Sequence, residues 1–271
     1  MDTISPSLEG QGIRATWRAF FAFLTHPRLP RENVGHRAVF GDAAPGETQP
    51  APPAGFGAES LKRVAHLFAL DVALMVPLVL ALLALEAAGV TFPESALGDL
   101  DLTPLIIAAI VIGAPLIEEL AFRGWLTGRP AALLGFGTVA VAYLGTTFLV
   151  PELPDSAQAI ASLVSLALPV VIGILAYALL RGRAAPGWYD RAFPLFYAFS
   201  VLSFAAIHIG NYEQGELPLY ALLPLVIPQA LAGLVWGYAR VTLGLWASML
   251  LHAVHNGTAV GLILLFGEAV R

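Results

Sequence analysis

Cysteine is absent from this chain of 271 residues, and charged residues make up only 12% of it. Without cysteine the chain can form no disulfide, zinc ribbon or thiol nucleophile, so any metal site must use His, Asp or Glu. Soluble domains carry about 25% charged residues, so this chain has too few polar side chains to cover a water-facing surface. The scarcity of charge therefore excludes an ordinary soluble globule.

Hydrophobic residues make up 58% of the chain and occur in runs near the length that crosses a hydrocarbon core. We predict an all-α, polytopic membrane protein with about seven transmembrane helices and with its functional site buried in the bundle. The predicted spans are 64–88, 103–127, 131–150, 158–180, 192–210, 217–239 and 242–266.

The first 60 residues differ in composition from the rest. They are rich in arginine and contain a Pro/Gly/Ala tract, 43–57, that predicts a flexible linker. Aromatic residues beside Arg14 and Arg18 fit either a helix lying in the membrane interface or a partly ordered tail. We therefore divide the chain into a cytoplasmic Arg-rich tail with its linker, 1–60, and a transmembrane domain, 61–271.

The predicted loops alternate in charge along the chain. Arginines mark the cytoplasmic side of a membrane protein, whereas acidic residues have little influence on orientation. This pattern predicts a multi-pass protein of the plasma (inner) membrane with its N-terminus in the cytoplasm and its C-terminus outside. The arginines concerned are Arg123, Arg129, Arg181, Arg183, Arg191 and Arg240, and the acidic loops hold Glu94, Asp99, Asp101, Glu152, Asp155, Glu213 and Glu216.

Two adjacent glutamates lie inside the second predicted span. A charge there costs from about 2.5 to over 10 kcal/mol, so such residues need partners and are functional candidates. Glu119 and Arg123 are four residues apart on one helix face and can pair. Glu118 points about 100° away from Glu119 and is free to act as a general base. Pro115 can kink the helix just before them, and the alternative is that all three charges lie at the membrane interface.

Two further predicted spans carry histidines. His208 lies late in the fifth span, and His252 and Asn256 share one face of the seventh, from which His255 is offset. Each could be a structural residue that makes hydrogen bonds between helices. Taken together, a carboxylate and two imidazoles can activate a water molecule, directly or through a bound metal.

The ordered set resembles the CAAX-protease and bacteriocin-processing family of intramembrane peptidases, also called the CPBP or Abi family. The family pattern is Glu-Glu-x-x-x-Arg, then Phe-x-x-x-His, then His-x-x-x-Asn. All three motifs occur in order within residues 105–260. They are Glu118-Glu119 with Arg123, Phe204 with His208, and His252 with Asn256.

The resemblance implies an intramembrane endopeptidase that hydrolyses a peptide bond of a membrane protein or a lipid-linked peptide, with no nucleic-acid partner. Glu118 and His208 would activate water, and His252 and Asn256 would bind metal or stabilise the oxyanion. Glu119 would maintain the catalytic site, with structural support from Arg123 and Phe204. Glu118, His208 and His252 would form the ligand set if the protein uses one divalent metal ion such as zinc.

Other hypotheses fit the same residues. The chain could be a non-catalytic membrane scaffold or regulator on this fold, or a proton-coupled transporter.

Two features do not fit the simplest form of this prediction. The 84 residues between Glu119 and Phe204 exceed the usual spacing of about 30 in this family, and they contain two predicted spans. The predicted spans also put His208 near the outer end of its helix, whereas Glu118 and His252 lie in the cytoplasmic half. A shared site requires all three at one depth.

Overall fold

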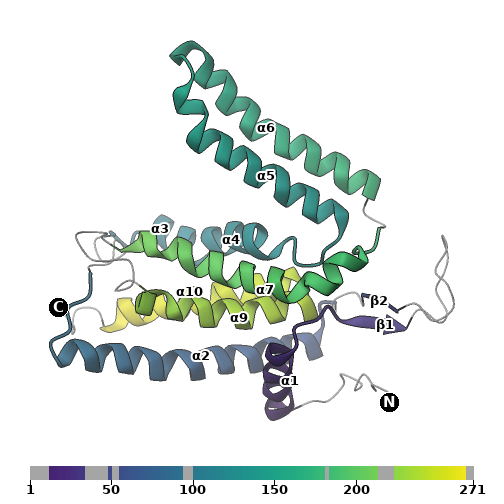
Figure 1. Ribbon diagram of the computed structural model, residues 1–271. Coiled ribbons are helices and arrows are strands. Elements are labelled where there is room, and N and C mark those ends of the chain that lie inside the picture. Colours follow the sequence, from purple (N-terminus) through teal and green to yellow (C-terminus); the bar gives the residue numbers. More distant parts are fainter. Residues whose placement is uncertain are drawn as a thin grey trace. The chain divides into compact units, whose positions relative to one another are not determined.

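The computed structural model describes residues 12–33, 48–50, 55–93, 100–180, 183–212 and 223–266, and these are almost entirely helical (Figure 1). The predicted all-α polytopic class is confirmed. The strands among the described residues are β1 (Arg31–Asn33) and β2 (Thr48–Pro50), which form a short antiparallel pair. The helices are α1 (Ile13–Thr25), α2 (Ala58–Ala87), α3 (Pro104–Ala108), α4 (Ala114–Arg123), α5 (Pro130–Phe148), α6 (Asp155–Leu180), α7 (Gly187–Ile207), α9 (Ile227–Thr242) and α10 (Leu245–Phe266).

Six helical segments of the described chain are long and apolar enough to cross a membrane. They correspond to all the predicted spans except 217–239. There α9 begins at Ile227 and has only 16 residues, much of it buried against other helices. Residues 217–222 of that predicted span lie outside the described residues, as does most of the predicted linker 43–57. The predicted division at residue 60 falls in the first turn of α2.

The chain separates into two compact units. The second comprises residues 28–52 and 124–193, including α5 and α6, which pack against each other and account for most of the long interval between the first two motifs. The first comprises residues 1–27, 53–123 and 194–271, and it holds every predicted site residue. Within this first unit α10 contacts α2, α4 and α9.

The amphipathic segment beside Arg14 and Arg18 forms helix α1, which lies across α2 (Figure 1). The indole Nε1 of Trp17 donates to the backbone carbonyl of His66 at 2.7 Å, and the Thr16 hydroxyl is 3.1 Å from the Nδ1 atom of the same histidine. Phe20 is buried in the hydrophobic core. Helix α1 of the predicted tail is therefore packed within the first unit.

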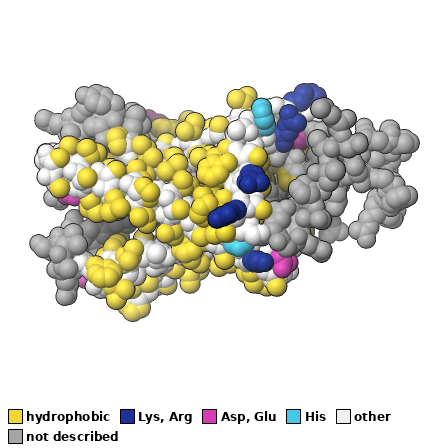
Figure 2. Space-filling view, turned by 90° about the horizontal axis from the view of Figure 1, so that it is seen from below, with side chains coloured by type: hydrophobic (Ala, Val, Ile, Leu, Met, Phe, Trp, Pro, Cys, Tyr) yellow, Lys and Arg dark blue, Asp and Glu magenta, His cyan; other side chains and the backbone are white. Residues whose placement is uncertain are grey.

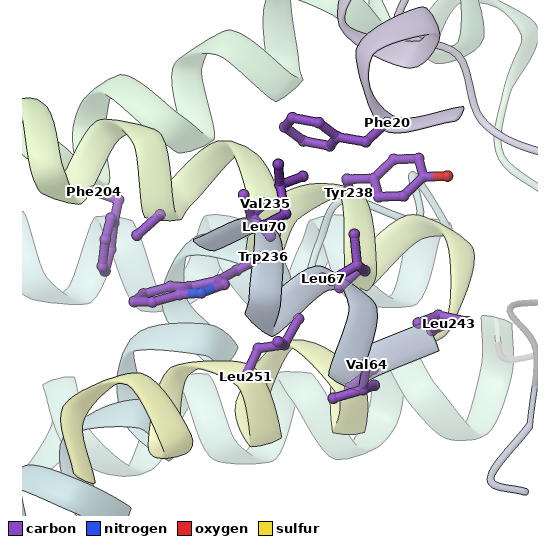
Figure 3. Close-up of a cluster of buried hydrophobic side chains, with 13 residues drawn as sticks. Phe20, Val64, Leu67, Leu70, Phe204, Val235, Trp236, Tyr238, Leu243 and Leu251 are labelled. Carbon is purple, nitrogen blue, oxygen red and sulfur yellow. The ribbon is translucent and has the colours of Figure 1, made fainter. Parts of the chain in front are cut away.

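A cluster of buried apolar side chains joins α1, α2, α7, α9 and α10 (Figure 3). Trp236 of α9 lies within this cluster, and its ring is 5.7 Å from that of Phe204 in an edge-on arrangement. The hydrophobic core thus extends to Phe204, the first residue of the second motif.

Large hydrophobic side chains also cover the outside of the first unit. Exposed residues such as Val76, Leu80 and Leu83 follow α2, and apolar side chains dominate the face in Figure 2. Lys and Arg side chains gather toward one end of this face, the end at which α1 and the start of α2 lie. This distribution is expected for a helix bundle surrounded by lipid.

Helix α9 approaches α7 through a glycine. A Cβ atom at Gly237 would lie only 2.8 Å from the Tyr197 ring, and the Tyr197 hydroxyl donates to the Leu234 carbonyl of α9. Gly237→Ala is therefore expected to lower the free energy of unfolding by about 1–3 kcal/mol, because the helices must separate or the ring must rotate. Thermal unfolding in detergent measures the effect. Gly261→Ala is the matched control, since a Cβ there meets no atom within 4 Å, and an equal loss in both variants would contradict the prediction.

Candidate active site

The site begins with a π-helical turn, Ala109–Gly113, directly before α4. In a π-helix each carbonyl pairs with the N–H five residues later, and for Ile110 that residue is Pro115, which has no N–H. The side chain of Asn256 supplies the missing donor, since its Nδ2 lies 2.9 Å from the Ile110 carbonyl oxygen. The structure therefore directs the amide nitrogen of Asn256 to the backbone about two helical turns before Glu118.

A fully buried ion pair follows on α4. The Arg123 Nη1 atom donates to Glu119 Oε1 at 2.7 Å, and neither side chain is exposed to solvent. The pairing predicted from the spacing of four residues is confirmed as a contact. Two groups from α10 complete the surroundings of the carboxylate: His252 Nδ1 is 3.0 Å from Glu119 Oε1, and the Ser248 hydroxyl donates to Glu119 Oε2. Glu119 thus joins α4 to α10.

Arg123 is held from its other sides as well. Its guanidinium carbon lies 3.9 Å from the centre of the Phe204 ring, a cation–π contact. Helix α4 ends at this residue, and its last carbonyls are satisfied by side chains from other helices. Arg240 Nε donates to the Arg123 carbonyl at 2.8 Å, and the Ser200 hydroxyl donates to the Phe122 carbonyl at 2.7 Å.

Glu118 points away from this pair, toward two histidines. Its Oε2 atom lies 3.7 Å from His252 Nε2 and 3.9 Å from His208 Nε2. The same oxygen is buried and has no hydrogen-bond partner within the described part of the chain. The Glu118 side chain is 24% exposed and that of His208 15%, whereas His252 is only 3% exposed. The site is therefore partly open on the side of Glu118 and closed behind His252.

Hydrogen bonds fix which nitrogen of each imidazole faces Glu118. His208 Nδ1 lies 2.7 Å from the Phe204 carbonyl, and His252 Nδ1 contacts the Glu119 carboxylate. Carbonyls and carboxylates only accept, so each Nδ1 carries a proton, and each neutral ring presents its Nε2 lone pair to Glu118. Three acceptor atoms thus converge with no donor among them. Such an arrangement attracts a species that donates protons or carries positive charge.

The predicted difference in depth between His208 and the other two residues is not found. The Nε2 atom of His208 lies only 3.9 Å from Glu118 Oε2, so the position of His208 within its predicted span, 192–210, did not give its depth relative to α4. His208 follows the last residue of α7 and begins a 3-10 turn. The three motifs therefore meet at one level.

The donor types at this point suit a divalent metal, since catalytic zinc takes His nitrogens and carboxylate oxygens. The spacing is wider than coordination requires, because tetrahedral ligands about 2 Å from zinc lie about 3.3 Å from one another. Correspondingly, no group of three His, Asp or Glu among the described residues is close enough to be a metal centre. The three side chains therefore carry the atoms that a divalent metal binds. Small side-chain rotations would have to shorten the distances from Glu118 to the two histidines before one ion could contact all three.

Some residues around the site were not predicted. Ser248 is four residues before His252 and eight before Asn256, so the helical period alone could have placed it on the same face. Asp71 of α2 is fully buried and bonds to His255, and its position inside an apolar span was a signal that the sequence contained. Trp236 stacks on His252 with ring centres 4.0 Å apart, a contact that only the fold reveals.

Comparison with protein families agrees with the motif-based resemblance. The family model described as Type II CAAX prenyl endopeptidase Rce1-like matches residues 100–258, more than half of the chain. The match includes α4, α7, α9 and the motif-bearing part of α10, and it excludes α1 and α2. No curated protein and no solved structure matches the chain.

Proposed function

Because the chain belongs to the type II CAAX prenyl endopeptidase Rce1-like family, we propose that it is an intramembrane endopeptidase whose water-activating residues are Glu118 and His208. One observation carries this proposal: the buried, unpartnered Glu118 Oε2 faces the Nε2 atoms of two histidines. Such a group of acceptors in a low-dielectric interior binds a water molecule and takes a proton from it.

The chemistry assigned to the chain is general-base hydrolysis of a peptide bond. Glu118 accepts a proton from water as the water attacks the scissile carbonyl, and it returns that proton to the leaving amine. His208, held by the Phe204 carbonyl, orients the same water through Nε2. The His208 ring is held in place before the substrate arrives, which lowers the reorganisation needed in the transition state.

The remaining motif residues would maintain this geometry. The Glu119–Arg123 pair fixes α4, and Glu119 also holds Nδ1 of His252. Asn256 stabilises the π-helical turn before Glu118 through the Ile110 carbonyl. In this assignment the Asn256 amide acts on the backbone of the site, and His252 is the residue of the third motif that faces Glu118.

A metal ion would strengthen the proposed reaction. Glu118, His208 and His252 would hold it, and a divalent ion such as zinc would supply a Lewis acid for the scissile carbonyl.

We infer that the substrate is a membrane protein or a lipid-linked peptide cut at the level of the bilayer. The Glu118 side is the exposed side of the site, and the surrounding helices present apolar side chains. The inferred orientation is that of a plasma (inner) membrane protein with a cytoplasmic N-terminus, since exposed Arg14, Arg18 and Lys62 belong to α1 and the start of α2.

Cleavage assays on purified protein test the proposal. Wild type is expected to cut one or more peptides of a panel containing transmembrane peptides and prenylated CAAX peptides, and His208→Ala is expected to lower kcat by about a hundredfold or more. Thr258→Val, at an exposed residue of α10 away from the site, is the matched control and should behave as wild type. Loss of cleavage with a chelator, restored by added zinc, would assign the metal.

The outcome that would overturn the proposal is equal behaviour of wild type and His208→Ala, with both proteins folded, across the whole panel. A non-catalytic scaffold on this fold would then be the better hypothesis.

A further inference from the structure

A second acid–imidazole pair, with a buried carboxylate and a half-buried histidine, lies next to the proposed active site. Asp71 of α2 is fully buried, and its Oδ2 atom is 2.6 Å from His255 Nδ1 of α10. The family match begins at residue 100, so α2 and its aspartate lie outside the matched region. A buried carboxylate in a membrane span is costly, and its other oxygen, Oδ1, has no hydrogen-bond partner among the described residues. This cost requires an explanation.

The pair fixes one histidine between two helices. Asp71 can only accept, so Nδ1 of His255 carries the proton and the ring cannot rotate without breaking a short, strong bond. His255 is one helical turn after His252 and side by side with Asn256 along the chain. Helix α2 is thereby joined to the segment of α10 that carries the third motif.

Trp236 connects this pair to the active-site imidazole. Its indole stacks on the His252 ring at 4.0 Å with an angle of 22° between the planes. The His255 ring meets the same indole edge-on, with centres 5.3 Å apart. His255 and His252 therefore contact one tryptophan, and the indole is the wall that lies against the plane of the His252 ring.

Two constraints together determine where His252 Nε2 points. The hydrogen bond from His252 Nδ1 to Glu119 holds one edge of the imidazole ring in place. The stacked indole of Trp236 prevents the ring from rotating about that bond. Without the stacked indole, the His252 ring could rotate and move its Nε2 atom away from Glu118 Oε2. These two atoms are 3.7 Å apart in the structure. A change in position of about 1 Å at a reacting group can cost a hundredfold in rate.

We propose that Asp71 and His255 are positioning residues that, through Trp236, hold the His252 imidazole with its Nε2 atom directed at Glu118. The kinetic consequence depends on the proposed peptidase function. The structural consequence, a fixed Trp236 and His252, does not depend on it.

The structural test uses protein labelled with 5-fluorotryptophan, in which fluorine NMR resolves five tryptophans and Trp236→Phe assigns one of them. Asp71→Leu and His255→Leu are each expected to shift or broaden the Trp236 resonance. Asp71→Asn keeps an oxygen that accepts from His255 and is expected to restore it. Thr16→Val is the matched control, because it removes another buried polar contact to α2 and lies beside Trp17; it should move the Trp17 resonance and leave that of Trp236 unchanged.

The kinetic test uses the same variants with any peptide that wild type cleaves. Asp71→Leu is expected to lower kcat by about tenfold or more with little change in KM, and Asp71→Asn to retain most of the activity. Thr16→Val separates positioning from general destabilisation, since it should lower the unfolding temperature without lowering kcat.

An unchanged Trp236 resonance in both leucine variants would overturn the inference. So would equal losses of kcat in Asp71→Leu and Thr16→Val at matched unfolding temperatures. If wild type cleaves no peptide, the proposed function fails, and the fluorine spectra still decide whether the pair positions Trp236. If Asp71→Leu does not fold, His255→Leu and Asp71→Asn provide the comparison.

Discussion

Glu118→Gln is expected to lower kcat by about a thousandfold while leaving the protein at least as stable as wild type. Glutamine keeps the shape of the side chain and removes the carboxylate that, in the proposed mechanism, accepts a proton from water. The same change removes a buried charge whose Oε2 atom has no hydrogen-bond partner in the described chain. Buried polar residues that serve catalysis commonly lower the stability of the folded protein. Replacing such a carboxylate by an uncharged side chain therefore leaves stability unchanged or raises it. Cleavage kinetics and thermal unfolding, measured on one preparation, give both quantities.

Glu86→Gln is the control for this substitution, because Glu86 is an exposed carboxylate at the end of α2. It should alter neither kcat nor the unfolding temperature. Full activity in Glu118→Gln would remove Glu118 from the proposed mechanism. A fall of several degrees in its unfolding temperature would instead show that the carboxylate has a structural partner.

Arg123→Met is expected to lower the free energy of unfolding by about 3–5 kcal/mol, the largest loss of any single substitution considered. The substitution leaves Glu119 ionised and buried without its cation, and it removes the guanidinium that lies over the Phe204 ring. Arg123→Lys should recover only part of this loss, because an ammonium group does not reproduce the planar contact with the ring. Unfolding in mixed detergent micelles measures the differences.

A double-mutant cycle separates the ion pair from its surroundings. Glu119→Gln combined with Arg123→Met should be less destabilising than the sum of the two single changes, because the second substitution removes a charge already left unpaired. Arg18→Met is the surface control, since Arg18 of α1 is exposed, and its effect should stay within about 0.5 kcal/mol. Additive losses in the double variant would contradict a buried pair.

The sequence was sufficient to predict the membrane class and the pairing within α4. Apolar runs have the length that a bilayer requires, so most helices were placed close to their observed positions. The contact between Glu119 and Arg123 follows from a local spacing of four residues and needs no knowledge of the fold. The angle of about 100° between successive helical residues also predicted that Glu118 and Glu119 point in different directions. In the structure Glu118 faces His208 and His252.

Features that depend on packing between helices were beyond the sequence. The depth of His208 was misjudged because hydropathy gives the length of an apolar run and not the depth of its residues relative to the other helices. The hydrogen bond from the Asn256 side chain to the Ile110 carbonyl requires the π-helical turn. The pattern of apolar residues gives no indication of that turn. The stacking of Trp236 on His252 likewise depends on how α9 packs against α10.

The motif charges also have a consequence for the way this protein enters the membrane. Glu119 and Arg123 lie one turn apart on the same face of α4, so they can neutralise each other as soon as that one helix has formed. A translocon therefore receives a segment whose two most costly charges are already paired. Glu118 has no such local partner, and the histidines that face it arrive only with α7 and α10, more than a hundred residues of synthesis later in the case of His252. The Glu119–Arg123 pair can thus form early in synthesis, whereas Glu118 meets both of its histidines only with the last described helix.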